Sequence, residues 1–276
     1  MPRSYSIFSA VAFGLVLLAV LNAAADELPE NFDAPQVLIV PPPQRPTLNF
    51  TLGGGASLGP SYFGSDEYSV LPRLPVNFTF LRIGSMEYGS TDPDAINSGF
   101  GLRGMFLYIP ERSASDHPEL TGLNDIDATL LLGLGLEYTT PNFETFADVG
   151  YGVIGTNAFV GRVGADWVTR PSDALTLRIG PRLFLMSDKF ANDYYGVTVA
   201  ESAPSGLAVY DPSGGLMSAG LQFRASYMLN DSWGLDSAVI WDRLMSDAAD
   251  NPITALGRDD QFTFQIALTR RFTWEF

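Results

Sequence analysis

The residues best suited to chemistry lie in one polar segment, residues 111–124. The chain's one histidine, His117, is there, with Ser113, Ser115, Asp116 and Asp125 close by in the sequence. A serine, a histidine and an acid can act as a hydrolase triad when the fold holds them in hydrogen-bond contact. Here all of them share a single loop, and no spacing fixes their geometry. We therefore expect a solvated loop and no catalytic residues.

Acidic loop residues form a second candidate site. These residues are Asp116, Glu119, Asp247, Asp250, Asp259 and Asp260. Carboxylate oxygens are ligands for Ca²⁺, but none of these loops has the regular spacing of a calcium loop. An acidic surface also serves solubility, so we predict no metal site and no cofactor. The formal net charge of −15 disfavours nucleic acid as a partner, and the absence of Cys excludes disulfides.

A third set of charged residues follows a regular pattern along the second half of the chain. The set is Glu144, Asp148, Arg162, Asp166, Arg178, Arg182, Arg224, Asp236 and Asp242. Each residue alternates with apolar neighbours, and successive side chains of a strand point to opposite faces. Small barrels fill their interior with side chains, and buried charges must be paired. We predict an Arg–acid network that plugs the lumen; the alternative is a charged pore lining.

The last sixteen residues indicate what the opposite face contacts. Residues 261–276 carry Phe, Ile, Leu or Trp at almost every even position, with Arg270 as the exception. A soluble edge strand this long and apolar would invite aggregation, whereas a strand facing lipid requires such a face. The ending, with Phe272, Trp274 and Phe276, resembles the closing strand of bacterial outer-membrane barrels. We interpret it as a barrel-assembly signal.

Alternating segments recur from residue 47 onward, and together they predict an all-β transmembrane barrel. The count is about ten antiparallel strands, or twelve if residues 81–97 contain a hairpin. With ten strands, the long loops at 59–67, 111–125, 187–215 and 246–260 fall outside the cell. The short turns near Thr140, Pro171 and Asn230 then fall in the periplasm. Long outer loops and short periplasmic turns are typical of such barrels.

The N-terminal residues divide into two segments before the barrel, which we place at 47–276. Residues 1–25 have a basic residue, an apolar run and a small-residue cleavage site, as a secretory signal peptide does. Residues 26–46 are acidic and Pro-rich and predict an extended periplasmic arm. Its apolar residues Val37, Leu38, Ile39 and Val40 could add a strand to a partner's sheet. They could equally plug the periplasmic mouth, or the arm could be a disordered tail.

Three loop motifs carry a resemblance to a known family, the MipA/OmpV family of outer-membrane proteins. The first motif contains Pro60, Tyr62, Gly64, Ser65, Asp66 and Tyr68; the second contains Tyr195, Gly196 and Val197; the third contains Asn251 and Pro252. Each motif alone is weak, but the three in order within an exported barrel are fairly specific. The aromatic residues Tyr62, Phe63, Tyr194, Tyr195 and Tyr210 could form a binding platform. We favour packing of the loops over the barrel mouth.

The resemblance implies a protein of the Gram-negative outer membrane, in contact with outer-membrane lipid. One family member is described as a scaffold that links a murein hydrolase, a lytic transglycosylase, to a murein synthase. Other members are described as adhesins or antigens. We therefore expect a scaffold without enzymatic activity. A surface binding module or adhesin is the first alternative, and a small pore or a lipid-modifying enzyme is the second.

Overall fold

A computed structural model describes residues 45–92 and 95–276. The expected signal peptide and nearly all of the expected arm, including Val37 to Val40, lie outside the described residues. In the part of the chain that is described, no helix is long and apolar enough to cross a membrane.

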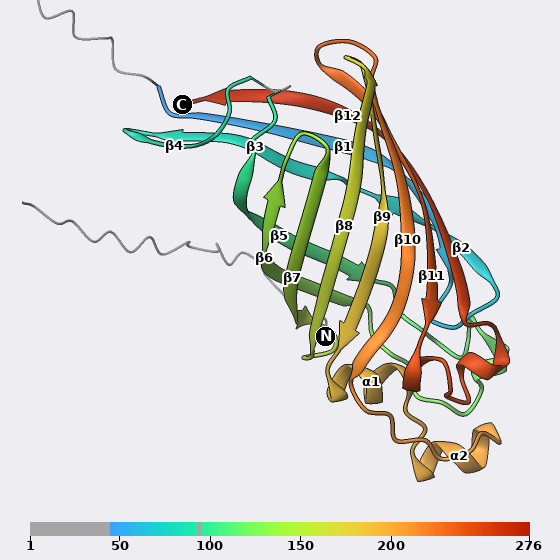
Figure 1. Cartoon of the computed structure of the whole chain (residues 1–276). Helices are drawn as coiled ribbons and strands as arrows, with labels where there is room; N and C mark the ends of the chain where they lie inside the picture. Colours follow the sequence, from blue (N-terminus) through green and yellow to red (C-terminus); the bar gives the residue numbers. More distant parts are fainter. Residues whose placement is uncertain (1–44, 93–94) are drawn as a thin grey trace, which may run out of the picture. The chain divides into compact units, whose positions relative to one another are not determined.

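Twelve antiparallel strands form one curled sheet in the described residues (Figure 1). The first six are β1 (Thr47–Pro60), β2 (Tyr68–Arg73), β3 (Val76–Ile83), β4 (Met86–Gly89), β5 (Gly99–Ile109) and β6 (Thr129–Thr139). The other six are β7 (Phe143–Ile154), β8 (Phe159–Ser172), β9 (Leu175–Met186), β10 (Gly215–Met228), β11 (Trp233–Leu244) and β12 (Asp260–Glu275). The predicted transmembrane β-barrel fold is confirmed.

The twelve strands make ten passes along the barrel. β2 and β3 are two halves of one pass, because both pair with β1 and only Leu74 and Pro75 separate them. β4 and β5 run in the same direction, since β4 is antiparallel to β3 and β5 is antiparallel to β6. They form one interrupted pass. Twelve strands less these two shared passes leave ten passes within the described chain. The strand count thus agrees with the twelve-strand alternative, since residues 81–97 contain the β3–β4 hairpin.

The first and last strands pair along nearly their whole length. β1 and β12 run from Thr47 opposite Glu275 to Leu58 opposite Phe264. The rings of Phe50 and Phe272 stack with centroids 5.4 Å apart. The even-numbered apolar side chains of β12 are exposed on the outer face, as the alternation predicts. Arg270, the exception, lies with its guanidinium 5.2 Å from the ring of Trp233, so its charge rests on an aromatic side chain.

The sheet has one seam, where β5 meets the β3–β4 hairpin. Within residues 45–92 and 95–276, no backbone ladder joins β5 to β2, β3 or β4. The Tyr88 hydroxyl bridges the gap: it donates to the Leu102 carbonyl at 3.0 Å and accepts from the Leu102 amide at 3.2 Å. One side chain thus replaces a ladder pair at this point.

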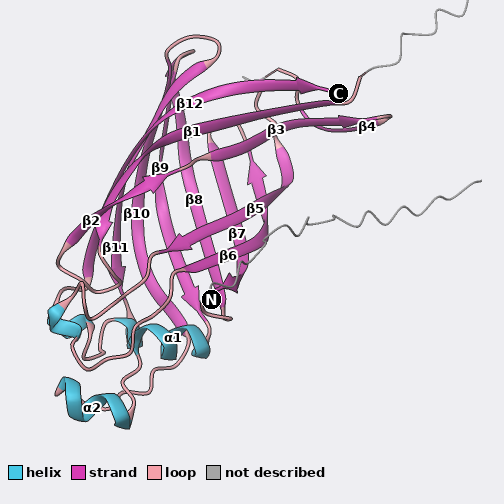
Figure 2. Cartoon of the chain, turned by 180° about the vertical axis from the view of Figure 1, so that it is seen from behind, coloured by secondary structure: helices cyan, strands magenta, loops and turns pink. Residues whose placement is uncertain are grey.

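The helices all lie at one end of the strands (Figure 2). They are η1 (Pro118–Leu120), α1 (Asp188–Tyr195), α2 (Val199–Ser205), η2 (Ser246–Ala248) and η3 (Thr254–Leu256). We call this the loop end. The opposite end, the turn end, carries Thr47, Glu275 and the short connections 84–85, 140–142, 173–174 and 229–232. This asymmetry matches the predicted distribution of long loops and short turns.

Candidate functional site

Ion pairs line the inner face of β7, β8 and β9. Arg162 lies 2.9 Å from Asp148, Arg178 lies 3.0 Å from Glu144, and Arg182 lies 2.7 Å from Asp166. Six of the nine charged residues predicted for the lumen are thus brought together as three pairs. The Arg178–Glu144 pair joins β9 to β7 and passes over β8. Such a pair requires both side chains to point into the barrel.

Two arginines that the sequence analysis did not include complete these contacts. Arg103 of β5 lies 3.0 Å from Asp148, so this carboxylate faces two guanidinium groups. Arg73 of β2 lies 2.7 Å from Asp236 of β11, although β1 and β12 lie between the two strands in the sheet. Both arginines occupy the polar face of alternating segments, so the pattern that identified the other residues would also have identified them.

Two predicted lumen residues are placed differently. Arg224 and Asp242 form no direct ion pair with a described residue, and the buried Nε of Arg224 has no hydrogen-bond partner. Asp236, predicted with them, accepts from Ser226 at 2.9 Å in addition to its pair with Arg73. The predicted residues therefore do not form one continuous chain of contacts.

The three motif loops and the loop between β5 and β6 converge at the loop end. These four loops form a packed layer that we call the loop cap: residues 61–67, 110–128, 187–214 and 245–259. Phe63 of the first motif lies 5.6 Å from the Tyr194 ring and 6.5 Å from the Tyr195 ring. Tyr62 packs in one cluster with Val197 and Ile253. Tyr62, Tyr194 and Tyr195 are buried, and Phe63 is partly buried against the same cluster. These side chains therefore pack the loops together and do not form an exposed binding platform.

Polar residues of the motifs hold the cap from within. Asn251 is buried and accepts from the amides of Ile253 and Thr254 at 3.0 and 2.8 Å. The Gln261 side chain donates to the Ser65 carbonyl at 3.1 Å. Gly64 has a φ of +94°, and a Cβ atom there would lie 2.6 Å from Thr254 Oγ1. The first motif therefore needs glycine both for its backbone and for its contact with the third.

A cation is buried in the centre of the cap. Arg112 is 5% exposed and donates to the Tyr194 carbonyl at 2.6 Å. Burial lowers the pKa of Arg112, although nearby tyrosines and Glu201 oppose the shift. Burial also raises the pKa of Tyr195, whose hydroxyl has no hydrogen-bond partner among the described residues. The sequence gives no periodic signal for Arg112, because it lies in an irregular loop.

Glu201 joins two of the loops, 110–128 and 187–214. One carboxylate oxygen accepts from the Asn124 amide and side chain at 2.9 and 2.8 Å. The other accepts from the Thr198 amide and hydroxyl at 2.9 and 2.6 Å. Burial alone would raise the pKa of Glu201, but these hydrogen bonds outweigh it and lower the pKa. The Thr198–Glu201 capping box that begins α2 was readable in the sequence and was missed.

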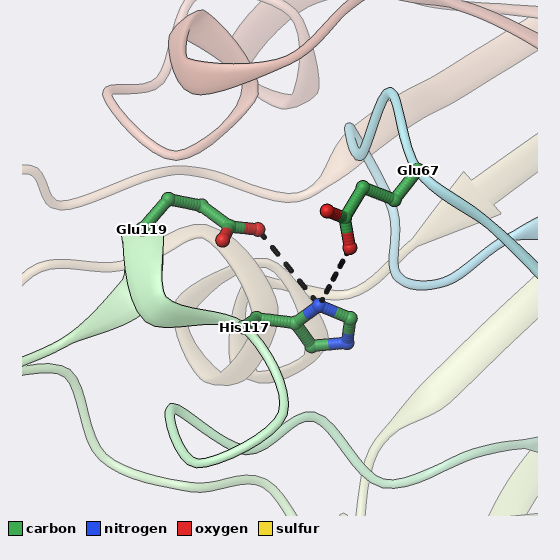
Figure 3. Close-up of side chains that lie close together, drawn as sticks. All are labelled: Glu67, His117 and Glu119. Atoms are coloured by element: carbon green, nitrogen blue, oxygen red, sulfur yellow. Dashed lines mark ion pairs between the residues drawn. The ribbon is translucent and has the colours of Figure 1, made fainter.

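His117 faces carboxylates and not the nearby serines (Figure 3). Its Nδ1 atom lies 3.5 Å from Glu67 Oε2 and 3.8 Å from Glu119 Oε1. Ser113 and Ser115 instead hydrogen-bond to each other at 2.7 Å. The acids considered for calcium are also dispersed: Asp259 and Asp260 both pair with Arg243. Neither the triad nor the calcium loop considered above is assembled by the described residues.

Comparisons with known proteins place the chain in a family. The sequence profile of the family described as MltA-interacting protein MipA matches residues 52–272. The MltA-interacting proteins of Escherichia coli (strain K12) and Shigella flexneri are each 26% identical over 215 residues, which is 74% of this chain and 83% of each relative.

Among solved structures, an outer-membrane channel from Pseudomonas putida F1 has a TM-score of 0.40 and 12% identity, covering 87% of this chain and all of that chain. The translocator domain of the autotransporter NalP from Neisseria meningitidis has a TM-score of 0.39 and 10% identity, covering 83% and 88%. The protein is an outer-membrane β-barrel of a Gram-negative bacterium. It belongs to the family of the MltA-interacting protein MipA.

Proposed function

We propose that the protein is a non-enzymatic adaptor that holds a lytic transglycosylase at the periplasmic side of the outer membrane. The observation that carries this proposal is the family match over residues 52–272, together with relatives whose name states an interaction with MltA. A murein synthase is a second candidate partner, since a scaffold for murein growth would hold both activities.

We place the turn end on the periplasmic side, where murein lies, because short turns are periplasmic in barrels of this type. Its short connections leave little to contact, except for the β3–β4 hairpin, whose side chains Ile83, Met86 and Tyr88 are exposed. The tip of the hairpin, residues 83–86, follows Arg82, which pairs with Thr47, so the tip extends beyond the first residue of β1. The arm, residues 26–46, is the other candidate handle, through Val37 to Val40.

Retention of the partner from detergent extract tests the proposal. The bait is the protein in mixed micelles, and the probe is a lytic transglycosylase of the MltA type. We expect capture by the wild-type barrel. Deletion of residues 26–45 and a double variant, Ile83→Ser with Met86→Ser, separate the arm from the hairpin. Val199→Ser is the matched control, because Val199 is an exposed apolar residue at the loop end.

Each result has a defined meaning. Loss of capture in one turn-end variant, with capture retained by Val199→Ser, identifies the handle. Capture unchanged by both turn-end changes, alone and combined, contradicts docking at this end. Failure of the wild-type barrel to retain the enzyme contradicts the adaptor function itself. Heat-dependent migration on gels establishes that each variant has folded before capture is scored.

The arrangement of the lumen charges favours a plug over a pore. Arg178–Glu144 and Arg73–Asp236 each join strands that are not neighbours, so their side chains extend into the space that ions would cross. We infer that the barrel carries no large, stable current. Single-channel recording in planar bilayers tests this, and sustained large openings would contradict it.

A further inference from the structure

We propose that Glu67, His117 and Glu119 bind a divalent zinc ion that fastens two loops of the cap together. Each residue offers one potential ligand atom, and these three atoms all lie within 4.8 Å of one another. Glu67 comes from the loop between β1 and β2, whereas His117 and Glu119 come from the loop between β5 and β6. Figure 3 shows the imidazole pointing between the two carboxylates.

The spacing fits ligands of one ion better than hydrogen-bonded partners. Ligand atoms 2.0–2.2 Å from a tetrahedral zinc are roughly 3.3–3.6 Å apart. Nδ1 of His117 is 3.5 and 3.8 Å from its two carboxylate oxygens. A charge-assisted hydrogen bond would instead draw one oxygen to about 2.7–2.9 Å. The longer of these two distances is thus about 0.2 Å outside the tetrahedral range, and the two carboxylate oxygens lie within 4.8 Å of each other.

The Nδ1 atom of His117 is buried and is not engaged in a hydrogen bond with any described residue. The side chain as a whole is only 12% exposed, and the ring edge packs against Tyr62 with centroids 5.0 Å apart. A buried polar atom normally has a hydrogen-bond partner, and the two carboxylate oxygens that face this one are too distant for a good hydrogen bond.

The surrounding structure holds the ligands in place. Tyr62 donates a hydrogen bond to Glu119 Oε1 at 2.9 Å. Glu119 lies in η1 between Pro118 and the buried Leu120. The Glu67 amide donates to Ser65 Oγ at 3.0 Å, and its carbonyl accepts from the Ser61 amide at 2.9 Å. Outer contacts of this kind orient ligands in metal sites.

The donor set favours zinc over calcium or magnesium. Zinc accepts imidazole nitrogen and carboxylate oxygen together and is satisfied by three protein ligands and a water. Calcium needs six to eight oxygen ligands, and magnesium retains most of its water and binds oxygen. The two carboxylates supply the negative charge that a divalent cation requires. The site lies at the loop end and is independent of a partner at the turn end.

The test is zinc binding by the full-length barrel, purified in micelles without a histidine tag and stripped with chelator. His117 is the chain's one histidine, so its ring resonances in NMR report the site without overlap. We expect one zinc per chain, a shift of these resonances, and slower proteolysis of residues 110–128. Excess Ca²⁺ or Mg²⁺ should not displace the ion.

Variants distinguish a built site from general attraction to an acidic surface. His117→Gln and Glu67→Gln each remove a direct ligand and should weaken binding by more than about 100-fold, beyond the 10- to 100-fold of an outer contact. Tyr62→Phe should weaken it by about 10-fold or more. Glu111→Gln, an exposed acid in the same loop, is the control and should bind as the wild type does.

Glu67→Gln is the variant least expected to disturb folding, because the Glu67 side chain is 61% exposed and contributes little to the packing of the loop cap. Zinc bound at one per chain with the predicted losses supports the site. Equal binding by wild type, Glu67→Gln and Glu111→Gln overturns it, as does the absence of saturable binding. Displacement by calcium at similar concentration also overturns it.

Discussion

The two ends of the barrel are built in opposite ways. At the loop end, four loops share aromatic clusters, the buried Arg112 and a carboxylate with four hydrogen bonds. At the turn end, the connections are short, the β3–β4 hairpin is exposed, and one tyrosine bridges the seam. The difference indicates that the loop end is fixed by its own contacts, whereas the turn end depends on strand pairing and is free to meet another molecule.

Removing the strand pairing at the turn end should have the largest effect on the protein. Deleting residues 272–276 removes the partners of Thr47, Leu48, Asn49 and Phe50. Unpaired backbone groups in lipid each cost several kcal/mol, so we expect assembly to be lost. Heat-dependent migration on gels and extraction with the outer membrane measure it. Normal insertion of the shortened chain would contradict both the role of these pairs and the proposed assembly signal.

A substitution in the middle of the barrel tests whether buried, paired side chains stabilise the lumen as they stabilise the loop cap. The Asp148 side chain is 0% exposed and faces Arg103 and Arg162. Asp148→Asn keeps the shape but removes the counter-charge of Arg162 and leaves Arg103 with only Glu137, at 3.9 Å, which should cost about 3–5 kcal/mol. Urea titration in micelles measures the free energy of unfolding. Asp259→Asn is the control, because its partner Arg243 is half exposed and such pairs contribute about 0–1 kcal/mol.

Equal losses in these two variants would mean that the lumen is hydrated enough to screen its ion pairs. The pairs would then resemble those of a water-filled pore more than those of a plug.

The sequence predicts the strands of the barrel better than it predicts the contacts of the loop cap. Strict alternation of apolar and polar residues identified the strands from β6 to β12 and placed Asp148 and Arg162 on the inner face. In a membrane barrel, the apolar residues of an alternating strand face lipid and the polar residues face the lumen. Alternation could not choose Arg103 as a partner of Asp148, since that depends on strand register and barrel curvature. The β3–β4 hairpin was left open because β4 has only four residues, too few for a pattern.

The cap was harder to predict for a different reason. Its stability comes from contacts between loops far apart in the sequence, such as Asn124 with Glu201 and Tyr62 with Glu119. Neither pair follows a period. The local signal at Thr198 and Glu201 was present, yet it predicts only where α2 begins and not what the carboxylate contacts. Burial of Arg112 was likewise invisible without the fold.

Glu201 allows the cap to be weakened without changing the barrel. Glu201→Gln should destabilise the docking of α2 on residues 110–128 by about 1.5–3 kcal/mol, because the amide cannot accept from four donors. The pKa of Glu201 is lowered, so its stabilisation is complete above the ordinary value of 4.5 and is lost as pH falls through the folded pKa. Hydrogen exchange of α2, corrected for intrinsic rates, measures both effects.

The wild type and the variant should therefore differ at neutral pH and converge in acid. Glu111→Gln, on the same loop, should follow the wild type throughout. A difference that persists unchanged in acid would show that the carboxylate charge is not what holds the helix.

A change at the seam between β4 and β5 should have the smallest effect on stability, and it tests whether the two ends of the barrel are independent. Tyr88→Phe removes both hydrogen bonds to Leu102 but keeps the ring, and should cost about 1 kcal/mol, a typical net value for neutral bonds. We expect faster exchange of the Leu102 amide and unchanged exchange in the cap, since no contact of Tyr88 reaches the loop end. Tyr108→Phe is the control: Tyr108 is on β5, the strand of Leu102, and its side chain is exposed at the outer face. If both variants leave Leu102 equally protected, another contact closes the seam. If Tyr88→Phe loosens the cap as well, the two ends are coupled and the turn end is not the independent region that its sparse contacts indicate.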